Sequence, residues 1–150
     1  DFLAAFRRGE LEKDFVAVIR FQGPRANGMP ELHKLTPPMG VLQDKGFKVA
    51  LITDGRMSGA SGKVPSVIHL CPECEMGGPL AKVHNGDRIS LNLQTGDINV
   101  LVDNDEFNAR VPVPNSARNH HMGMGREMFG HFRLGASSAE TGASNLFIVD

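Results

Sequence analysis

An apolar run at residues 47–53, FKVALIT, leads directly into the glycine-rich stretch DGRMSGASGKVP at residues 54–65, and this combination constrains the fold most. A run of this kind predicts a buried strand. Residues 14–21, DFVAVIRF, show little polar alternation and are rich in β-branched and aromatic side chains, so they predict a second buried strand. We therefore expect two buried strands, one of which ends at a glycine-rich corner.

The rest of the chain predicts short elements, because 17 glycines and 9 prolines mark many turns. Extended segments are expected at residues 65–70 and 77–83, and at 87–102 as a hairpin that turns at Thr95-Gly96-Asp97. Helical segments are expected at residues 2–8, 31–46, 103–110 and 125–134. Pro37 and Pro38 should break the second of these, and Gly46 should cap its end. Residues 22–30 should form a loop. The tail after 110, which includes the helical segment at 125–134, should form either a docking arm or a disordered segment.

Length and composition favour one mixed β/α domain, dominated by strands, with short helices on its outside. The net charge of −1 and the absence of Tyr and Trp disfavour nucleic-acid binding. No apolar run approaches the roughly 20 residues that cross a bilayer, so we expect no membrane association. The charged opening DFLAAFRRGELEKDF is no signal peptide, and the two cysteines form no disulfide framework, which together favour a reducing cytoplasm. The missing initiator Met favours a piece of a longer protein.

The glycine-rich stretch does not match a mononucleotide-binding loop. That motif begins with a glycine. Five residues later a second glycine is followed by Lys and then by Ser or Thr. Gly62 and Lys63 are present, but Met57 and Val64 occupy the two other checkable positions. A general anion nest built from backbone N–H groups remains open.

The same stretch can instead present a hydroxyl group. Ser58 and Ser61 lie among glycines, where the chain can turn sharply and other groups can approach closely. A serine acts as a base only when cations or amide donors stabilise its alkoxide, and Arg56 and Lys63 flank the pair. The alternative is an ordinary turn with solvated serines.

Glu31 follows Pro30 at the junction between the expected loop and the next helical segment. A carboxylate there either favours the helix N-terminus or ligates Mg²⁺, a hard ion that takes oxygen ligands. Nearby His33 is expected to be a surface residue.

Cys71 and Cys74 have the spacing of half a zinc or iron–sulfur site. A structural zinc site needs four ligands, and the other dense candidates, His120 and His121, are adjacent in sequence and far along the chain. We expect two reduced structural thiols, with a zinc-ribbon interaction domain and a thioredoxin-like redox pair as alternatives.

Three stretches, VIRFQGPRANGMPELHKLTP, VALITDGRMSGASGKVP and GGPLAKVHNGDRI, together resemble the C-terminal domain of the dihydroxy-acid and 6-phosphogluconate dehydratase family. The resemblance covers roughly residues 1–135, and the tail GREMFGHFRLGASSAETGA is also similar. It implies a swivelling β/β/α barrel-like domain with short flanking helices. Residues 1–135 would form its core and 136–150 its tail, and a larger cluster-bearing N-terminal domain would be absent from this chain.

The resemblance implies a hydro-lyase of the Entner–Doudoroff route that dehydrates 6-phosphogluconate to 2-keto-3-deoxy-6-phosphogluconate. Such enzymes use Mg²⁺ and an iron–sulfur cluster of the 4Fe–4S kind, whose cysteines belong to the N-terminal domain. We therefore expect that Cys71 and Cys74 are not cluster ligands, that this chain alone is inactive, and that the full-length enzyme is a homodimer. Alternatives are a related dehydratase for another sugar acid or dihydroxy acid, and a non-catalytic module that binds a phosphosugar or a protein.

Two residue roles carry over from the family motifs. Glu31 matches the carboxylate of GMPE, for which the resemblance implies a role as Mg²⁺ ligand, and Ser58 matches the serine of DGRMSG, for which it implies a role as alkoxide base. Ala60 departs from the threonine of some relatives, which leaves open what supports the alkoxide. Candidate substrate-binding residues are Arg25, Asn27, Ser61 and Lys63.

Overall fold

The computed structural model describes residues 2–59, 62–116, 122–123 and 125–146. At the centre of these residues is a parallel sheet with the order β1-β2-β3, formed by β1 (Phe15–Ile19), β2 (Val49–Thr53) and β3 (Ser66–Val67). The strands predicted at 14–21 and 47–53 are confirmed. β2 is the middle strand, and all of its residues are buried because apolar clusters cover both faces of the sheet.

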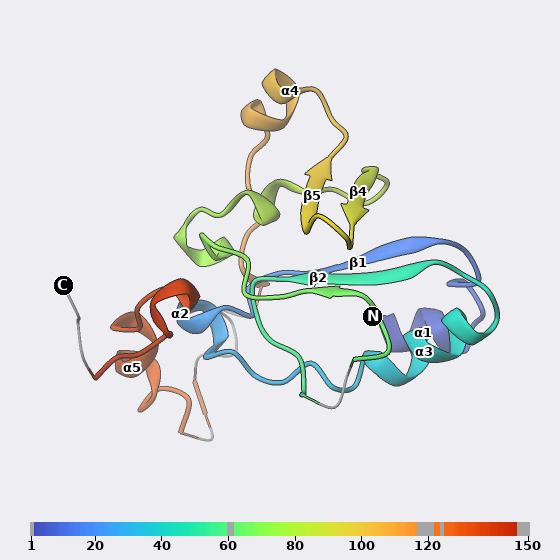
Figure 1. Cartoon of the computed structure of the whole chain (residues 1–150). Coiled ribbons are helices and arrows are strands. Elements are labelled where there is room, and N and C mark those ends of the chain that lie inside the picture. The colour runs from blue at the N-terminus through green and yellow to red at the C-terminus, as the bar shows by residue number, and fades with distance from the viewer. Residues whose placement is uncertain (1, 60–61, 117–121, 124, 147–150) are drawn as a thin grey trace.

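Alternate side chains of the central strands point to opposite faces of the sheet, and each face carries its own apolar cluster. Ala17 and Leu51 belong to one cluster and Val18 and Ile52 to the other. The first cluster is covered by α1 (Phe2–Arg7) and α3 (Thr36–Asp44), both of which lie below the sheet in Figure 1.

The second face is covered by the hairpin of β4 (Ile89–Asn92) and β5 (Asp97–Val100), by α4 (Asn104–Ala109), and by the 3-10 helices η1 (Cys74–Met76) and η2 (Pro79–Lys82). The hairpin, in which Ile89 lies opposite Val100, and the helix expected at 103–110 are both confirmed. Figure 1 shows these elements above the sheet, so the sheet is the middle layer of three.

The strand expected at 77–83 is wrong, because this segment contains η2. Pro79 is the first residue of that helix, where its fixed φ suits a helical turn and its missing N–H would weaken a strand. The Ala81 N–H closes the turn on the Gly78 carbonyl at 3.1 Å.

The prolines at 37 and 38 do not break the helical segment at 31–46. They lie in the first turn of α3, where a backbone N–H has no partner within the helix in any case. Gly46 ends the segment as expected: its φ is +95°, and the following Phe47 N–H donates to the Leu42 carbonyl at 3.1 Å.

Three further expectations change in extent. The segment at 22–30 contains a short helix, α2 (Pro24–Asn27), β3 is shorter than the run at 65–70, and the helix within 125–134 is α5 (Gly130–Leu134). The described part of the tail docks rather than projecting freely, because Arg25 Nε donates to the Ala136 carbonyl at 2.7 Å and Ala136 is buried. It contains the 3-10 helix η4 (Ala139–Thr141). Figure 1 shows α5 and this tail beside α2.

The fold class is confirmed as mixed α/β with short helices, but its finer description is not confirmed. Within the described ranges the strands are short and form two small sheets, neither of which closes into a barrel. The predicted barrel-like, strand-dominated architecture therefore lacks support.

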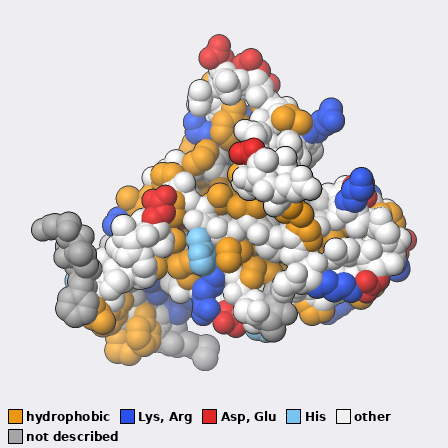
Figure 2. Space-filling model, viewed as in Figure 1, with side chains coloured by type: hydrophobic (Ala, Val, Ile, Leu, Met, Phe, Trp, Pro, Cys, Tyr) orange, Lys and Arg blue, Asp and Glu red, His pale blue; other side chains and the backbone are white. Residues whose placement is uncertain are grey.

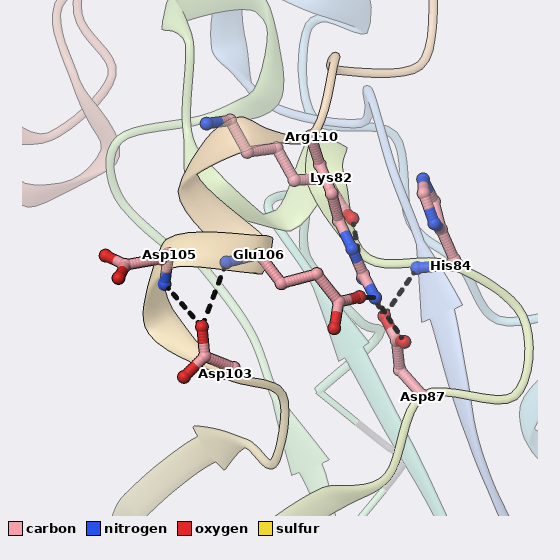
Figure 3. Close-up of polar contacts among 7 residues, drawn as sticks. All are labelled: Lys82, His84, Asp87, Asp103, Asp105, Glu106 and Arg110. Atoms are coloured by element: carbon pink, nitrogen blue, oxygen red, sulfur yellow. Dashed lines mark hydrogen bonds and ion pairs between the residues drawn. The ribbon is translucent and has the colours of Figure 1, made fainter.

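A nearly buried ion pair fastens α4 to the turn before β4 (Figure 3). The Arg110 guanidinium donates to both Asp87 oxygens, at 2.6 and 3.1 Å, and to Glu106 at 2.8 Å. Its hydrogen bonds lower the pKa of Asp87, and the His84 backbone N–H adds to this effect. Because these groups serve as partners for one another, we interpret the network as a structural brace.

Candidate functional site

The chain segments that leave β1, β2 and β3 meet at the carboxyl edge of the parallel sheet, where ligand sites of open α/β sheets commonly form. Gln22 N–H donates to Asp54 Oδ1 at 2.9 Å, and His69 N–H donates to the Gly55 carbonyl at 2.9 Å. Phe21 and His69 both have a φ of +58°, which costs energy for a residue with a Cβ and is often found at functional sites. This edge is the candidate site.

Asp54 anchors the corner that follows β2. Its side chain is fully buried, and its second oxygen accepts the Cys74 N–H at 2.9 Å. Gly55 lets the corner approach the neighbouring loop, because a Cβ there would lie 2.5 Å from Gln22 Cβ and 2.9 Å from the Gln22 carbonyl oxygen. Sequence analysis missed Asp54, although a carboxylate directly after a buried strand was a signal for it.

Ser58 and Lys63 line one pocket of about 440 Å³ against α3, together with His33 and Thr36. Ser58 is half-buried there. The Lys63 ammonium donates to both oxygens of Asp44 at 2.6 Å, so its positive charge is partly offset by an exposed carboxylate. The structure thus brings together two of the predicted residues, and His33, which is exposed as expected, lies at the same pocket.

Glu31 is tied to the same loop through Arg56, two residues before Ser58. Glu31 and Arg56 form an isolated parallel bridge, and Arg56 Nη1 donates to Glu31 Oε1 at 3.0 Å. Arg56 Nε also donates to the Met29 carbonyl at 2.7 Å. α3 begins only at Thr36 and has no acidic residue in its first turn, so the interpretation of Glu31 as a helix N-terminal charge is wrong.

The remaining substrate-binding candidates do not share that pocket. Arg25 lines a separate pocket of about 370 Å³ beside Cys71 and Glu73, and Asn27 lines one of about 350 Å³ beside α5. Asn27 donates to Gln22 Oε1 and accepts from Arg126, both at 2.9 Å. Ser61 and Ala60 lie outside the described residues.

Glu73 is a second buried carboxylate that sequence analysis missed. It accepts the backbone N–H of Arg25 at 2.9 Å and that of Ala26 at 3.1 Å, and so caps the start of α2. Burial raises the pKa of this carboxyl, and the two amide hydrogen bonds partly oppose the rise. Gly23 leaves room for it, because a Cβ at that position would lie 2.2 Å from Glu73 Oε2.

Both cysteines are free thiols. Cys74 packs in the second apolar cluster, and burial is the main cause that raises its pKa to about 12. A thiol that stays protonated is a weak nucleophile, which favours a structural role over a redox pair. Among the described residues no group of three His, Cys, Asp or Glu is placed to hold a metal, while His120 and His121 lie outside them.

None of the helices in the described part of the chain is both long enough and apolar enough to cross a membrane.

Comparison with known proteins gives a consistent match. Residues 1–143 match the family described as "Dihydroxy-acid/6-phosphogluconate dehydratase C-terminal". The chain is 61% identical over 140 residues to a phosphogluconate dehydratase of Pseudomonas aeruginosa, which covers 93% of the chain and 23% of the relative. It is 56% identical over 144 residues to that of Escherichia coli K12, covering 96% and 24%.

A dihydroxy-acid dehydratase of Aeropyrum pernix is 47% identical over 107 residues, which covers 71% of the chain and 19% of that relative. The chain spans about a quarter of the length of the phosphogluconate dehydratases that it matches.

Proposed function

The chain belongs to the dihydroxy-acid/6-phosphogluconate dehydratase C-terminal family, and we propose that it forms the C-terminal part of a hydro-lyase that dehydrates 6-phosphogluconate in the Entner–Doudoroff route. The observation that carries this proposal is the 61% identity over 93% of the chain with a protein named phosphogluconate dehydratase. The match to a dihydroxy-acid dehydratase is lower and shorter, at 47% over 71% of the chain.

In the proposed reaction Ser58 removes the proton from carbon 2 of the substrate, next to the carboxylate. The hydroxyl group on carbon 3 leaves as water once it has gained a proton, and the resulting enol tautomerises to 2-keto-3-deoxy-6-phosphogluconate. The half-buried position of Ser58 in a pocket supports this role. The Lys63 ammonium in the same pocket favours an alkoxide, although Asp44 offsets part of its charge.

Glu31 fits a role as one ligand of Mg²⁺. Its carboxylate is 43% exposed, and carboxylate oxygens are the ligands that this hard ion prefers. Bound Mg²⁺ would supply positive charge to stabilise the negative charge that develops on the substrate carboxylate. Glu31 is a single ligand, so the proposal assigns the other protein ligands to the remainder of the enzyme.

The cysteines of this chain do not fit an iron–sulfur cluster. Such clusters are generally held by four cysteine thiolates, whereas this sequence contains two cysteines and buries one of them in an apolar cluster. We therefore assign the proposed cluster, a Lewis acid for the departing hydroxyl group, to the part of the enzyme outside this chain.

Lys63 and Ser61 remain our candidates for contacts to an anionic group of the substrate near Ser58. Arg25 and Asn27 remain candidates for the phosphate group. Their pockets differ from that of Ser58, so in this proposal they contact a different end of the substrate.

The proposed partners are the rest of the same enzyme and a second copy of it, in the cytoplasm. Exposed apolar side chains support a covering partner: Met128, Phe129, Phe132 and Leu134 are each at least half exposed in and next to α5. Figure 2 shows apolar side chains gathered at that end of the molecule. The relatives extend about three quarters of their length beyond the matched region, which is ample chain to cover this surface.

The test is turnover by the intact enzyme that carries this chain. We expect it to consume 6-phosphogluconate and release the 2-keto-3-deoxy product much faster than it dehydrates a branched 2,3-dihydroxy acid. The chain of residues 1–150 alone should consume neither. Preference for the branched acid would assign the enzyme to the other branch of the family. Turnover by the isolated chain would refute the proposal that the active site also needs the part of the enzyme outside this chain.

A further inference from the structure

The chain segment that carries Glu31 is held at two points. At its far end Arg56 contacts Met29 and Glu31, as described above, and the Leu32 N–H donates to the Arg56 carbonyl at 3.2 Å. At its near end α2 is fixed by Glu73. Between them the chain turns through left-handed residues at Gly28 and Met29, with φ of +73° and +52°.

Two buried carboxylates cross-link the start of this segment to the turn that contains Cys74. Asp54 joins the Gln22 N–H to the Cys74 N–H, and Glu73, the residue before Cys74, holds the Arg25 and Ala26 N–H groups. Asp54 also begins the loop that carries Ser58. The segment that carries the proposed base and the segment that carries the proposed metal ligand are therefore held together by the same two carboxylates.

The hydrogen-bond donors to Asp54 and Glu73 determine how the two carboxylates hold the chain. Within the described ranges neither Asp54 nor Glu73 forms an ion pair, so both carboxylates are satisfied by backbone amides rather than by a flexible cationic side chain. A buried carboxylate is costly unless its hydrogen bonds are made. Such a group consequently fixes the path of the backbone itself.

We propose that Glu73 is a positioning residue for Glu31: its carboxylate fixes the start of α2, and α2 in turn fixes the place of the carboxylate at position 31. The inference rests on the proposed function, in which Glu31 ligates Mg²⁺. Glu73 does not touch the substrate or the metal in this proposal, and acts through the backbone.

The experiment compares the intact enzyme with its Glu73→Gln variant. Glutamine keeps the size of the side chain but turns an NH₂ donor toward backbone N–H groups. Outer-shell substitutions commonly weaken metal binding 10- to 100-fold, so we expect the Mg²⁺ concentration for half-maximal activity to rise about tenfold. Hydrogen exchange of the amides at residues 25–32, measured without substrate, should accelerate.

The matched control is Asp87→Asn, which removes a carboxylate whose side chain is 9% exposed and which also makes several hydrogen bonds, but in the Arg110 brace. It should lower the melting temperature without changing the Mg²⁺ requirement or the exchange at 25–32. The proposal is overturned if Glu73→Gln leaves both readouts unchanged, or if Asp87→Asn raises the Mg²⁺ requirement equally.

Glu73→Asp, which keeps the charge on a shorter side chain, replaces the glutamine variant if that variant does not fold. A wild-type enzyme that is inactive toward 6-phosphogluconate would contradict the proposed function instead. In that case the exchange at residues 25–32 still decides whether Glu73 holds this segment.

Discussion

Arg56 and Glu31 face each other across an isolated parallel bridge, and the Arg56 guanidinium donates to the Glu31 carboxylate at 3.0 Å. The same guanidinium holds the Met29 carbonyl. The loop that presents Ser58 and the segment that presents Glu31 are therefore joined by backbone and side-chain contacts, although Glu31 does not line the Ser58 pocket. This relationship makes it reasonable to test the two residues as parts of one site.

Glu31→Gln should raise the Mg²⁺ concentration for half-maximal activity of the intact enzyme by more than about tenfold, because it removes a charged ligand rather than an outer-shell partner. Activity measured across a Mg²⁺ series checks this. The control is Glu12→Gln, since Glu12 is also about half exposed and ion-paired, with Lys45. An equal shift in both variants would remove Glu31 as a ligand.

Ser58→Ala should reduce turnover of the intact enzyme by about 10²–10⁴-fold, the usual contribution of a general base, while cluster content and melting temperature stay unchanged. Steady-state kinetics with 6-phosphogluconate measure the loss. Ser90→Ala, at an exposed position of β4, should have no effect. Near-normal turnover by the Ser58 variant would exclude this hydroxyl as the base.

Gly55→Ala should destabilise the chain by about 1–3 kcal/mol, the range typical of overpacking. The new Cβ would lie 2.9 Å from the Gln22 backbone carbonyl oxygen, and backbone yields less readily than the end of a flexible side chain. Gly62→Ala is the control, because a Cβ at that position meets nothing within 4 Å. Denaturant unfolding of both variants provides the measurement, and equal stability would show that the corner can relax.

Glu73 and Asp87 should contribute to the pH dependence of stability with opposite signs. Burial raises the pKa of Glu73 above its ordinary 4.5, so the native state holds this proton more tightly than the unfolded state. The stability contributed by Glu73 should therefore fall as pH rises from about 4.5 through the native pKa. The free energy of unfolding of the wild type, relative to that of Glu73→Gln, should therefore fall as pH rises over that window.

Arg110 lowers the pKa of Asp87 below its ordinary 3.8, so its contribution is complete above that value and is lost as pH falls through the native pKa. The difference in free energy of unfolding between the wild type and Asp87→Asn should consequently become smaller at acid pH. Unfolding measured from pH 2 to pH 7 for the three proteins tests both signs, and parallel curves would contradict them.

Cys71 should react with iodoacetamide at pH 8 well before Cys74. Cys74 is buried with a pKa of about 12, so almost none of it is thiolate at that pH, whereas Cys71 is only half-buried. Mass spectrometry of the labelled peptides gives the two rates, and unfolding in denaturant should equalise them. Comparable rates in the folded protein would show that the segment around Cys74 opens readily.

Local sequence patterns were sufficient to predict the elements that depend mainly on residues near one another in the sequence. The apolar runs around Ala17 and Leu51 predicted β1 and β2, and Gly96 between alternating strands predicted the hairpin. The segment at 77–83 was misjudged because its apolar residues, which resemble a strand, fill the second cluster from a 3-10 helix that starts at Pro79.

The sequence by itself determined the two central strands, the glycine-rich corner with Ser58, and the membership of a family whose motifs it carries in order. Only the tertiary structure decided that Arg25 and Asn27 line pockets other than that of Ser58, and that Glu73 caps α2. The physical reason is that 48 residues separate Glu73 from Arg25. A contact over that distance depends on how the sheet gathers the ends of its strands, which no short stretch of sequence records.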